Sequence, residues 1–203
     1  NNQLRSIATK NNRPLEAKKP AASLAAVTGI TAVTTDPEIR YTTQHAGLML
    51  LMPFLKQLFT QLGLWSDQEW TSRDAQFKAV HLLQYLATGQ LMPPEYTLTL
   101  EKICCGLAVS MPVPLFVTLE ETDINEATSL LQSVIEHWKS LKHTSVSGLR
   151  ETFLKREGIM AKKDNDWLLR IERKTVDVLL DNIPWGFAIA RLPWSREVIF
   201  VEW

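Results

Sequence analysis

The chain has 203 residues, of which 45% are hydrophobic, and its 22 lysines and arginines balance 22 aspartates and glutamates. This length and composition suit one domain with a substantial core. Because no net positive charge would attract nucleic acid or an anionic membrane, we expect the partners to be proteins. The longest apolar run, 46–55, contains Pro53 and is about half the roughly twenty residues of a spanning helix, so no membrane insertion is predicted.

The first 43 residues are predicted to be a flexible tail or linker. They are rich in Ala, Thr and Asn, contain several prolines, and carry almost no large apolar side chains. The chain begins with Asn instead of Met. We interpret it as a processed product or as the C-terminal part of a longer protein, and we favour the second. The folded domain is expected over residues 44–203.

Two amphipathic helices are predicted at the start of this domain. The first has Pro53 in its first turn and Gly63 after its last turn, positions that both residues favour. The second covers 73–88 and ends at Gly89. The sequence therefore predicts a helical first half.

A shorter helix is expected over 98–107, where Cys104 and Cys105 are adjacent. A bridge between neighbouring cysteines is strained, so we interpret them as buried thiols of a reducing compartment. His81 and Tyr85 lie four residues apart on the preceding helix. With no acidic or cysteine partner nearby in the sequence, they are interpreted as packing residues instead of a polar site.

The helix that begins near Thr118 is predicted to be the centre of the fold. Thr118 and Glu121 fit a capping box, and helical spacing continues to Gly158. The spacing also suits a coiled coil, but Leu130 and Ile135 widen the apolar stripe, which favours a packed domain helix. The candidate core residues on this stripe are Leu131, Val134, Trp138 and Leu141.

After Gly158 the apolar period changes from helical spacing to alternation. Residues 159–163 and 167–173 predict a β-hairpin, and 187–192 and 198–201 predict a final pair of strands. The intervening 176–180 fits a short helix or another strand. Helices followed by strands indicate an α+β fold, mainly α-helical: a helix bundle around a central helix with a C-terminal antiparallel β-sheet.

No motif in the sequence predicts catalysis. His137 and His143 are six residues apart, which places them on different faces of a helix, whereas metal-binding pairs are three or four apart. Glu120 and Glu121 begin a helix, where carboxylates complement its dipole. The sequence lacks a recognisable phosphate loop, nucleophile elbow or cysteine–histidine pair. We therefore expect no enzyme, no cofactor and no metal site.

Tryptophan is the unusual feature of the composition, with seven in the chain. Trp185, Trp194 and Trp203 lie close to the end, two of them directly after proline. Tryptophan is common at interfaces because it joins a large apolar surface to one polar group. These three are candidate interface residues, and burial in the domain core remains the alternative.

Several segments together resemble a known family. They include HAGLMLLMPFLKQLF, KAVHLLQYLATGQ, LEKICCGL, VIEHWKSLK, SGLRETFLKREG, WLLRIERKTVDVLLDNIPWG and the ending IFVEW, in this order. This pattern is similar to the C-terminal region of tape measure proteins of contractile injection systems, which are phage-tail-like particles of bacteria. The resemblance covers about residues 44–203.

The resemblance implies a structural and assembly protein without catalytic residues. Such a protein occupies the tube lumen, sets tube length and is anchored on the spike and baseplate side. Implied partners are the baseplate hub or spike, the inner tube and further copies of the chain around the particle axis. The implied location is the bacterial cytoplasm during assembly and then the particle, with release outside the cell as a further option. The alternatives are an adaptor or chaperone-like module that holds an effector and, third, an unrecognised hydrolase.

Overall fold

A computed structural model describes residues 39–203 of the protein. The chain divides into two units, residues 1–35 and 36–203. Residues 1–38 of the expected tail lie outside the described part. Its last residues, Arg40–Thr43, form strand β1, which pairs with β4 (Gly158–Lys163). This pairing partner lies far along the chain, so local composition gave no sign of it.

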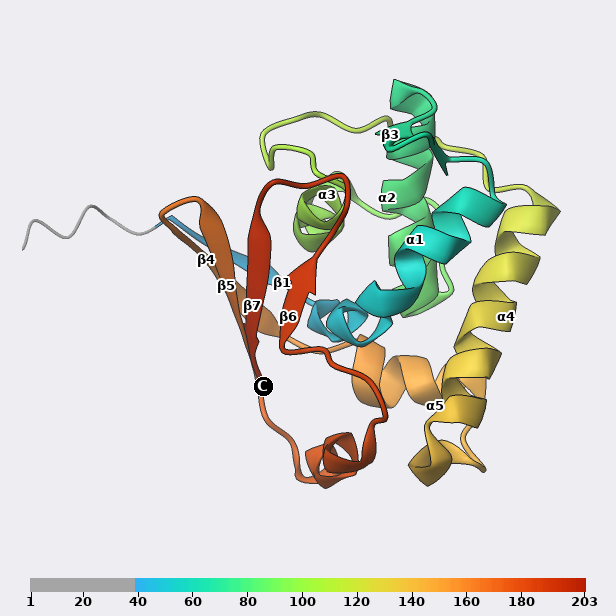
Figure 1. Ribbon diagram of the computed structural model, residues 1–203, viewed down its shortest axis with the longest axis vertical. Coiled ribbons are helices and arrows are strands. Elements are labelled where there is room, and N and C mark those ends of the chain that lie inside the picture. Colours follow the sequence, from blue (N-terminus) through green and yellow to red (C-terminus); the bar gives the residue numbers. More distant parts are fainter. Residues whose placement is uncertain (1–38) are drawn as a thin grey trace, which may run out of the picture. The chain divides into compact units, whose positions relative to one another are not determined.

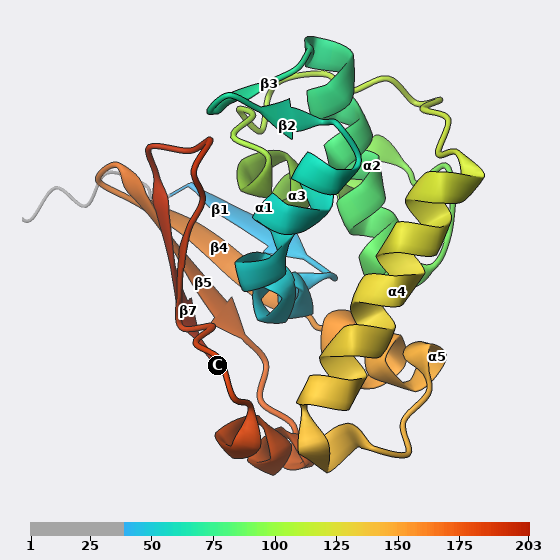
Figure 2. The same cartoon turned by 45° about the vertical axis from the view of Figure 1, so that its right-hand side comes forward.

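Helices form one layer of the described domain, and a sheet forms the other (Figures 1 and 2). The helical elements are η1 (Ala46–Leu51), α1 (Met52–Gln61), α2 (Arg73–Thr88), η2 (Glu95–Thr97), α3 (Thr99–Cys104), α4 (Glu121–His137), η3 (Lys139–Leu141), α5 (Val146–Leu149), η4 (Arg150–Leu154) and η5 (Thr175–Asn182). This arrangement confirms the predicted α+β class with helix predominating.

Helix α2 begins and ends where its sequence predicts. The Ser72 hydroxyl accepts the N–H of Ala75 at 2.9 Å, which satisfies one of the donors that a first turn leaves unpaired. Gly89 follows the helix with φ of 72°, a left-handed conformation that glycine adopts without strain. The predicted range 73–88 is confirmed.

The N-cap of helix α4 lies two residues later in the chain than the predicted N-cap, Thr118. Glu120 is the N-cap, and the Asp123 carboxylate accepts the Glu120 N–H at 2.6 Å. Lys78 of α2 lies 2.6 Å from the same carboxylate and fixes it in place. The box is therefore Glu120 with Asp123, and the Thr118 and Glu121 assignment is wrong.

The most buried element is η1, in which all six residues are buried. Helix α4 instead lies at the outer side of the helical layer and buries one face (Figure 2). The candidate core residues Leu131, Val134, Trp138 and Leu141 all lie inside, each at most 2% exposed. Trp138 caps the end of α4, and its indole N–H donates to Leu179 O at 3.1 Å. The core thus centres on η1, with α4 packed against it from outside.

The sheet has five strands in the order β1-β4-β5-β7-β6. Its other members are β5 (Asp166–Ile171), β6 (Ile189–Arg191) and β7 (Val198–Glu202). The predicted hairpin is present as β4 and β5, and the predicted final pair as β6 and β7. However, β5 and β7 run parallel, so the sheet is mixed instead of antiparallel. A small second sheet, β2 (Trp65–Ser66) with β3 (Glu69–Trp70), has no counterpart in the predictions.

The helical run after α5 ends at Leu154 in η4, before the predicted end at Gly158. Gly158 is the first residue of β4 and packs tightly on η1. A Cβ at this position would lie 2.8 Å from Ala46 Cβ and 2.9 Å from Leu169 Cδ1. Glycine is needed here for close packing of the sheet on the core, and it does not end a helix.

Candidate docking surface

One face of the five-stranded sheet packs against helices, and the described residues leave the other face open (Figures 1 and 2). The packed face carries Met160, Leu169 and Ile199, all buried. Side chains alternate between the two faces along each strand, so the neighbours of these residues point outward. The strand register then determines which outward side chains lie next to each other.

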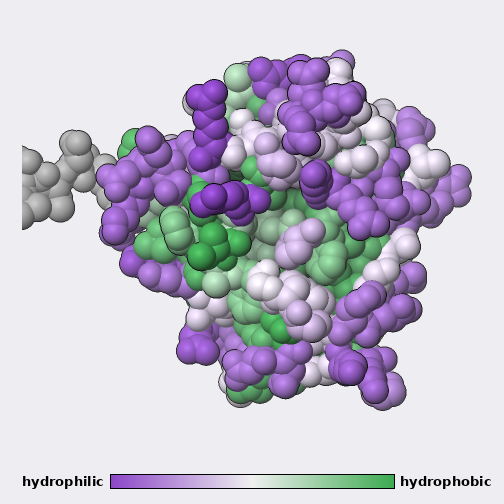
Figure 3. Space-filling model, in the orientation of Figure 1, coloured by the Kyte–Doolittle hydropathy of each residue, from purple (hydrophilic) through white to green (hydrophobic). Residues whose placement is uncertain are grey.

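An apolar row crosses the open face of the sheet. The register pairs Leu168 with both Ala161 and Phe200, and pairs Phe200 with Ile189. Phe200 is 43% exposed and Ile189 is 60% exposed, while Ile159 beside the row is 49% exposed. Figure 3 shows apolar surface around β6 and β7, framed by hydrophilic residues. Within the row Leu168 is half-buried and Ala161 is buried, so Phe200 and Ile189, with Ile159 beside them, supply the exposed apolar surface. Exposed apolar side chains gathered on one face are typical of a contact surface.

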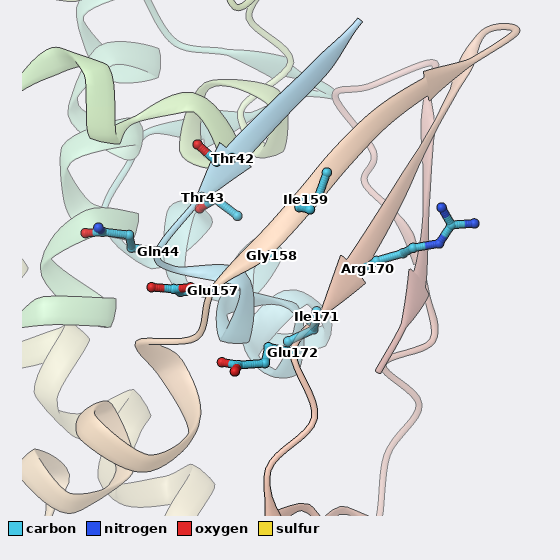
Figure 4. Close-up of a pocket in the computed structure, with 9 residues that line it drawn as sticks. All are labelled: Thr42, Thr43, Gln44, Glu157, Gly158, Ile159, Arg170, Ile171 and Glu172. Carbon is cyan, nitrogen blue, oxygen red and sulfur yellow. The ribbon is translucent and has the colours of Figure 1, made fainter. Parts of the chain in front are cut away.

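A groove of about 640 Å³ lies at one end of this face, and we call it the strand-end groove (Figure 4). Ile159 contributes an apolar side chain to it, and Thr42 lines it from β1. The carboxylates of Glu157 and Glu172 point the same way, whereas Arg170 points away from them. The Arg170 Nε donates to Glu202 Oε2 at 2.6 Å. The groove therefore combines an apolar side chain with an acidic rim.

The three candidate interface tryptophans are half-buried and belong to the packing of the domain itself. Each indole N–H donates to a distant part of the chain. Trp185 donates to Leu50 O at 2.9 Å, and Trp194 donates to Cys104 O at 2.7 Å. Both acceptors lie near the ends of helical elements, where carbonyls lack a partner within the helix. Trp203 donates to the carboxylate of Asp177 at 3.1 Å.

The rings of these tryptophans also contact other aromatic side chains. The centroid of Trp194 lies 5.3 Å from that of Phe59, and Trp65 and Trp70 complete the same cluster. The Trp203 ring packs edge-on against Phe187. Since both the N–H groups and much of the rings serve the fold, the open face of the sheet is the better candidate for docking.

A buried ion pair lies next to the sheet, between the segment that precedes β4 and η5. Arg156 is fully buried, and its guanidinium makes two contacts of 2.7 Å with the Asp177 carboxylate. Burial raises the pKa of Asp177, but bonds from Arg156, the Lys174 N–H and Trp203, together with the charge of Arg156, outweigh that effect and lower it overall. The pair joins η5 to the segment that precedes β4.

The residues closest to a catalytic arrangement surround α3. His45 Nδ1 lies 2.5 Å from Glu101 Oε1, and both side chains are buried. Cys104 and Cys105 are free and buried, and burial, followed by nearby negative charge, raises the pKa of both thiols well above its ordinary value. Such thiols stay protonated and are poor nucleophiles. This arrangement therefore does not supply a reactive cysteine.

His81 is a structural residue in this fold. Its Nε2–H donates to Pro114 O at 2.9 Å, and burial lowers its pKa although that bond raises it. Within residues 39–203, no group of three or more His, Cys, Asp or Glu side chains could hold a metal ion. Across the same residues, no helix is both long and apolar enough to cross a membrane.

Comparisons with known proteins identify the family. A search of curated proteins and a search of solved structures each found no match. The family model described as contractile injection system tape measure protein matches residues 1–203, the whole chain. This match confirms the resemblance carried by the sequence segments, and it gives the protein a structural role in an injection particle. The chain therefore belongs to the contractile injection system tape measure protein family.

Proposed function

We propose that residues 39–203 form a docking module of a tape measure protein. In this proposal the chain occupies the tube lumen during assembly and takes part in setting tube length. The docking module holds it at the spike and baseplate side. The open face of the sheet is the surface by which the module contacts another protein surface in the particle.

The observation that carries this proposal is the exposed apolar row on a sheet that the described helices cover on one side only. With about 200 Å² for a fully exposed large side chain, Ile159, Ile189 and Phe200 together expose about 300 Å². Patches of this size are often functional in soluble proteins. The row is built on paired strands, so a partner meets a preformed surface and little conformational entropy is lost on docking.

Charged substitutions on the open face test the proposal. We expect Phe200→Asp combined with Ile189→Asp to reduce the number of assembled particles strongly, because a docked carboxylate would lose its water. The matched control is Thr122→Asp with Gln132→Asp, both at exposed positions of α4. Particles are counted by electron microscopy, and the melting temperature of each purified chain verifies folding.

The outcomes separate docking from other roles. Normal particle numbers and lengths with the folded open-face variant would contradict docking through this face. Normal particles that lack a cargo protein would support the adaptor role instead. Deletion of residues 198–203 is a weaker test, because β7 lies between β5 and β6 and its loss would disrupt the sheet.

A further inference from the structure

Strand β6 is an edge of the five-stranded sheet. Its one neighbour among the described strands is β7, and no described strand lies on its outer side (Figure 1). It also carries the end of the apolar row, at Ile189. An unpaired strand edge presents a row of backbone N–H and C=O groups, which is a template for a further strand.

The backbone groups of Ile189 and Arg191 point away from β7. The Val201 N–H donates to Ala188 O at 2.8 Å, and the register of β6 and β7, continued by one residue, places these two residues opposite each other. Bonded and non-bonded pairs alternate along an antiparallel ladder, so Ala190 bonds to β7, whereas Ile189 and Arg191 do not. The N–H and C=O groups of these two residues therefore form the free edge of β6.

The side chains along this edge favour a particular kind of partner. Ile189 and Arg191 are exposed on the open face, while Ala190 between them is buried on the packed face. Within the described part of the chain, Arg191 has no ion-pair partner. Opposite charges and pairs of apolar side chains stabilise neighbouring strands when they lie directly opposite each other. A strand with a carboxylate opposite Arg191 and an apolar side chain opposite Ile189 would complement both.

We propose that β6 receives an extended segment of another particle protein as an additional, antiparallel strand of the sheet. This inference rests on the proposed docking role of the open face and names the class of partner. The segment carries a carboxylate opposite Arg191 and, two residues later, an apolar side chain opposite Ile189, which lengthens the apolar row. In such strand addition, main-chain hydrogen bonds supply affinity and alternate side chains supply specificity.

The edge distinguishes an extended segment from other partners. A docked helix has already paired its own backbone groups, so it would bury the edge groups of Ile189 and Arg191 without satisfying them. A second copy of β6 supplies no carboxylate, because residues 184–193 contain no Asp or Glu. Charged side chains on edge strands also discourage the pairing of like copies. Of these three partners, only an acidic extended segment satisfies both the backbone and the charge.

The experiment measures the binding of two soluble peptides to the full chain by isothermal titration calorimetry. The probe is a short threonine-rich peptide with a glutamate two residues before a valine. The control peptide has the valine two residues before the glutamate. In an antiparallel strand, only the probe places its glutamate at Arg191 when its valine lies at Ile189. We expect the control peptide to bind about fivefold more weakly, as the loss of a cross-strand pair predicts.

N-methylation of the probe tests the backbone ladder. A methyl group on the glutamate or the valine nitrogen removes an N–H that faces β6. It should weaken binding about tenfold, because a carbonyl of the edge loses its donor. A methyl group on the threonine between them removes an N–H that faces away from β6 and should leave binding nearly unchanged. Docking through side chains alone would not produce this alternation.

Variants at position 191 separate the backbone from the charge. Arg191→Thr loses the charge and keeps the N–H, whereas Arg191→Pro loses both. Proline is tolerated on an edge strand where the N–H faces outward, so both variants should fold. We expect Arg191→Pro to bind the probe about tenfold more weakly than Arg191→Thr does. Arg191→Glu should weaken binding of the probe about fivefold and prefer a probe with lysine in place of glutamate.

Other outcomes overturn the inference without touching the proposed function. A probe that does not bind at about 1 mM, equal weakening by all three methyl groups, or stronger binding of the control peptide would each show that β6 receives no such strand. If Phe200→Asp with Ile189→Asp still lost particles in that case, docking through the face would stand with a different kind of partner. If strand addition occurred but that variant assembled normally, the proposed docking function would fail instead.

Discussion

Arg156 and Asp177 form a buried, two-bonded ion pair that joins the segment before β4 to η5. Arg156 also donates to Glu172 O at 2.6 Å, and the Trp203 ring lies over the guanidinium at 5.4 Å. Trp203 contributes its indole N–H to the same carboxylate. One buried pair therefore fixes the positions of η5 and of the end of the described sheet at the same time.

Asp177→Asn should destabilise the domain strongly. Removing one partner of a buried pair leaves an uncompensated buried charge, which typically costs about 3 to 5 kcal/mol. The matched control is Asp181→Asn, an exposed carboxylate on the same element η5, where we expect a change of about 0.5 kcal/mol or less. Urea unfolding measures both free energies, and similar values for the two variants would contradict a structural role for the pair.

The contribution of Asp177 should depend on pH in a defined direction. Its pKa in the folded protein is lowered from the ordinary value of 3.8. A carboxyl with a depressed folded pKa stabilises the fold above its unfolded pKa, and that stability is lost as the pH falls through the folded pKa. The difference in unfolding free energy between wild type and Asp177→Asn should thus be constant above about pH 5 and shrink below about pH 4. A difference that grew on acidification would have the wrong sign.

Trp138→Ala should remove a large part of the domain's stability. Trp138 is fully buried, and its ring packs 4.7 Å from Phe153. Truncation of a buried tryptophan costs about 3 to 5 kcal/mol through lost contacts and the cavity that remains. The neighbouring His137→Ala, at an exposed position of α4, should change the melting temperature little. An unchanged melting temperature for Trp138→Ala would exclude this residue from the core.

Glycine at position 47 is required by its backbone contacts. A Cβ there would lie 1.7 Å from Phe153 O and 2.6 Å from Leu154 Cα, both backbone atoms that cannot move aside. Gly47→Ala should therefore cost at least about 1 to 3 kcal/mol, the usual range for overpacking. Gly186→Ala has open space around its added methyl group and should be nearly neutral. Thermal unfolding of the two variants checks the contrast, and equal stability would show that η1 and η4 are not in contact at Gly47.

The sequence predicts those elements whose signals are local. Helix α2 has a serine before it and a glycine after it, and both act within one turn of the helix end. The hairpin of β4 and β5 turns at Asp164 and Asn165, with Asp164 at φ of 55°, a conformation that Asp tolerates better than most residues. The alternation of apolar and polar residues, together with the turn residues, was sufficient to predict this hairpin.

Other features depend on contacts between distant residues. The start of α4 is fixed by Asp123, which is held by Lys78, while the sequence pattern favoured Thr118 because threonine is the commoner cap. The parallel pairing of β5 with β7 depends on the path of residues 172–197, which connect the two strands. The apolar row on the open face likewise cannot be predicted without the register of the four strands β4, β5, β7 and β6, because each contributes one residue to it.

For the tryptophans, amino-acid composition alone does not distinguish a core residue from an interface residue. Their number and position in the sequence were compatible with an interface or with a core. Only the acceptors of Trp185, Trp194 and Trp203, which lie far along the chain, show that these side chains hold the C-terminal segment on the helices. The open face of the sheet is therefore a better candidate for docking than these three tryptophans.

The most direct test of the docking module is an electron cryomicroscopy map of the assembled particle in which residues 39–203 are located. The proposed function predicts density for this fold at the spike and baseplate end of the lumen, with protein density against Ile159, Ile189 and Phe200. A map that placed the fold elsewhere, or that left the open face of the sheet in contact with solvent alone, would contradict it.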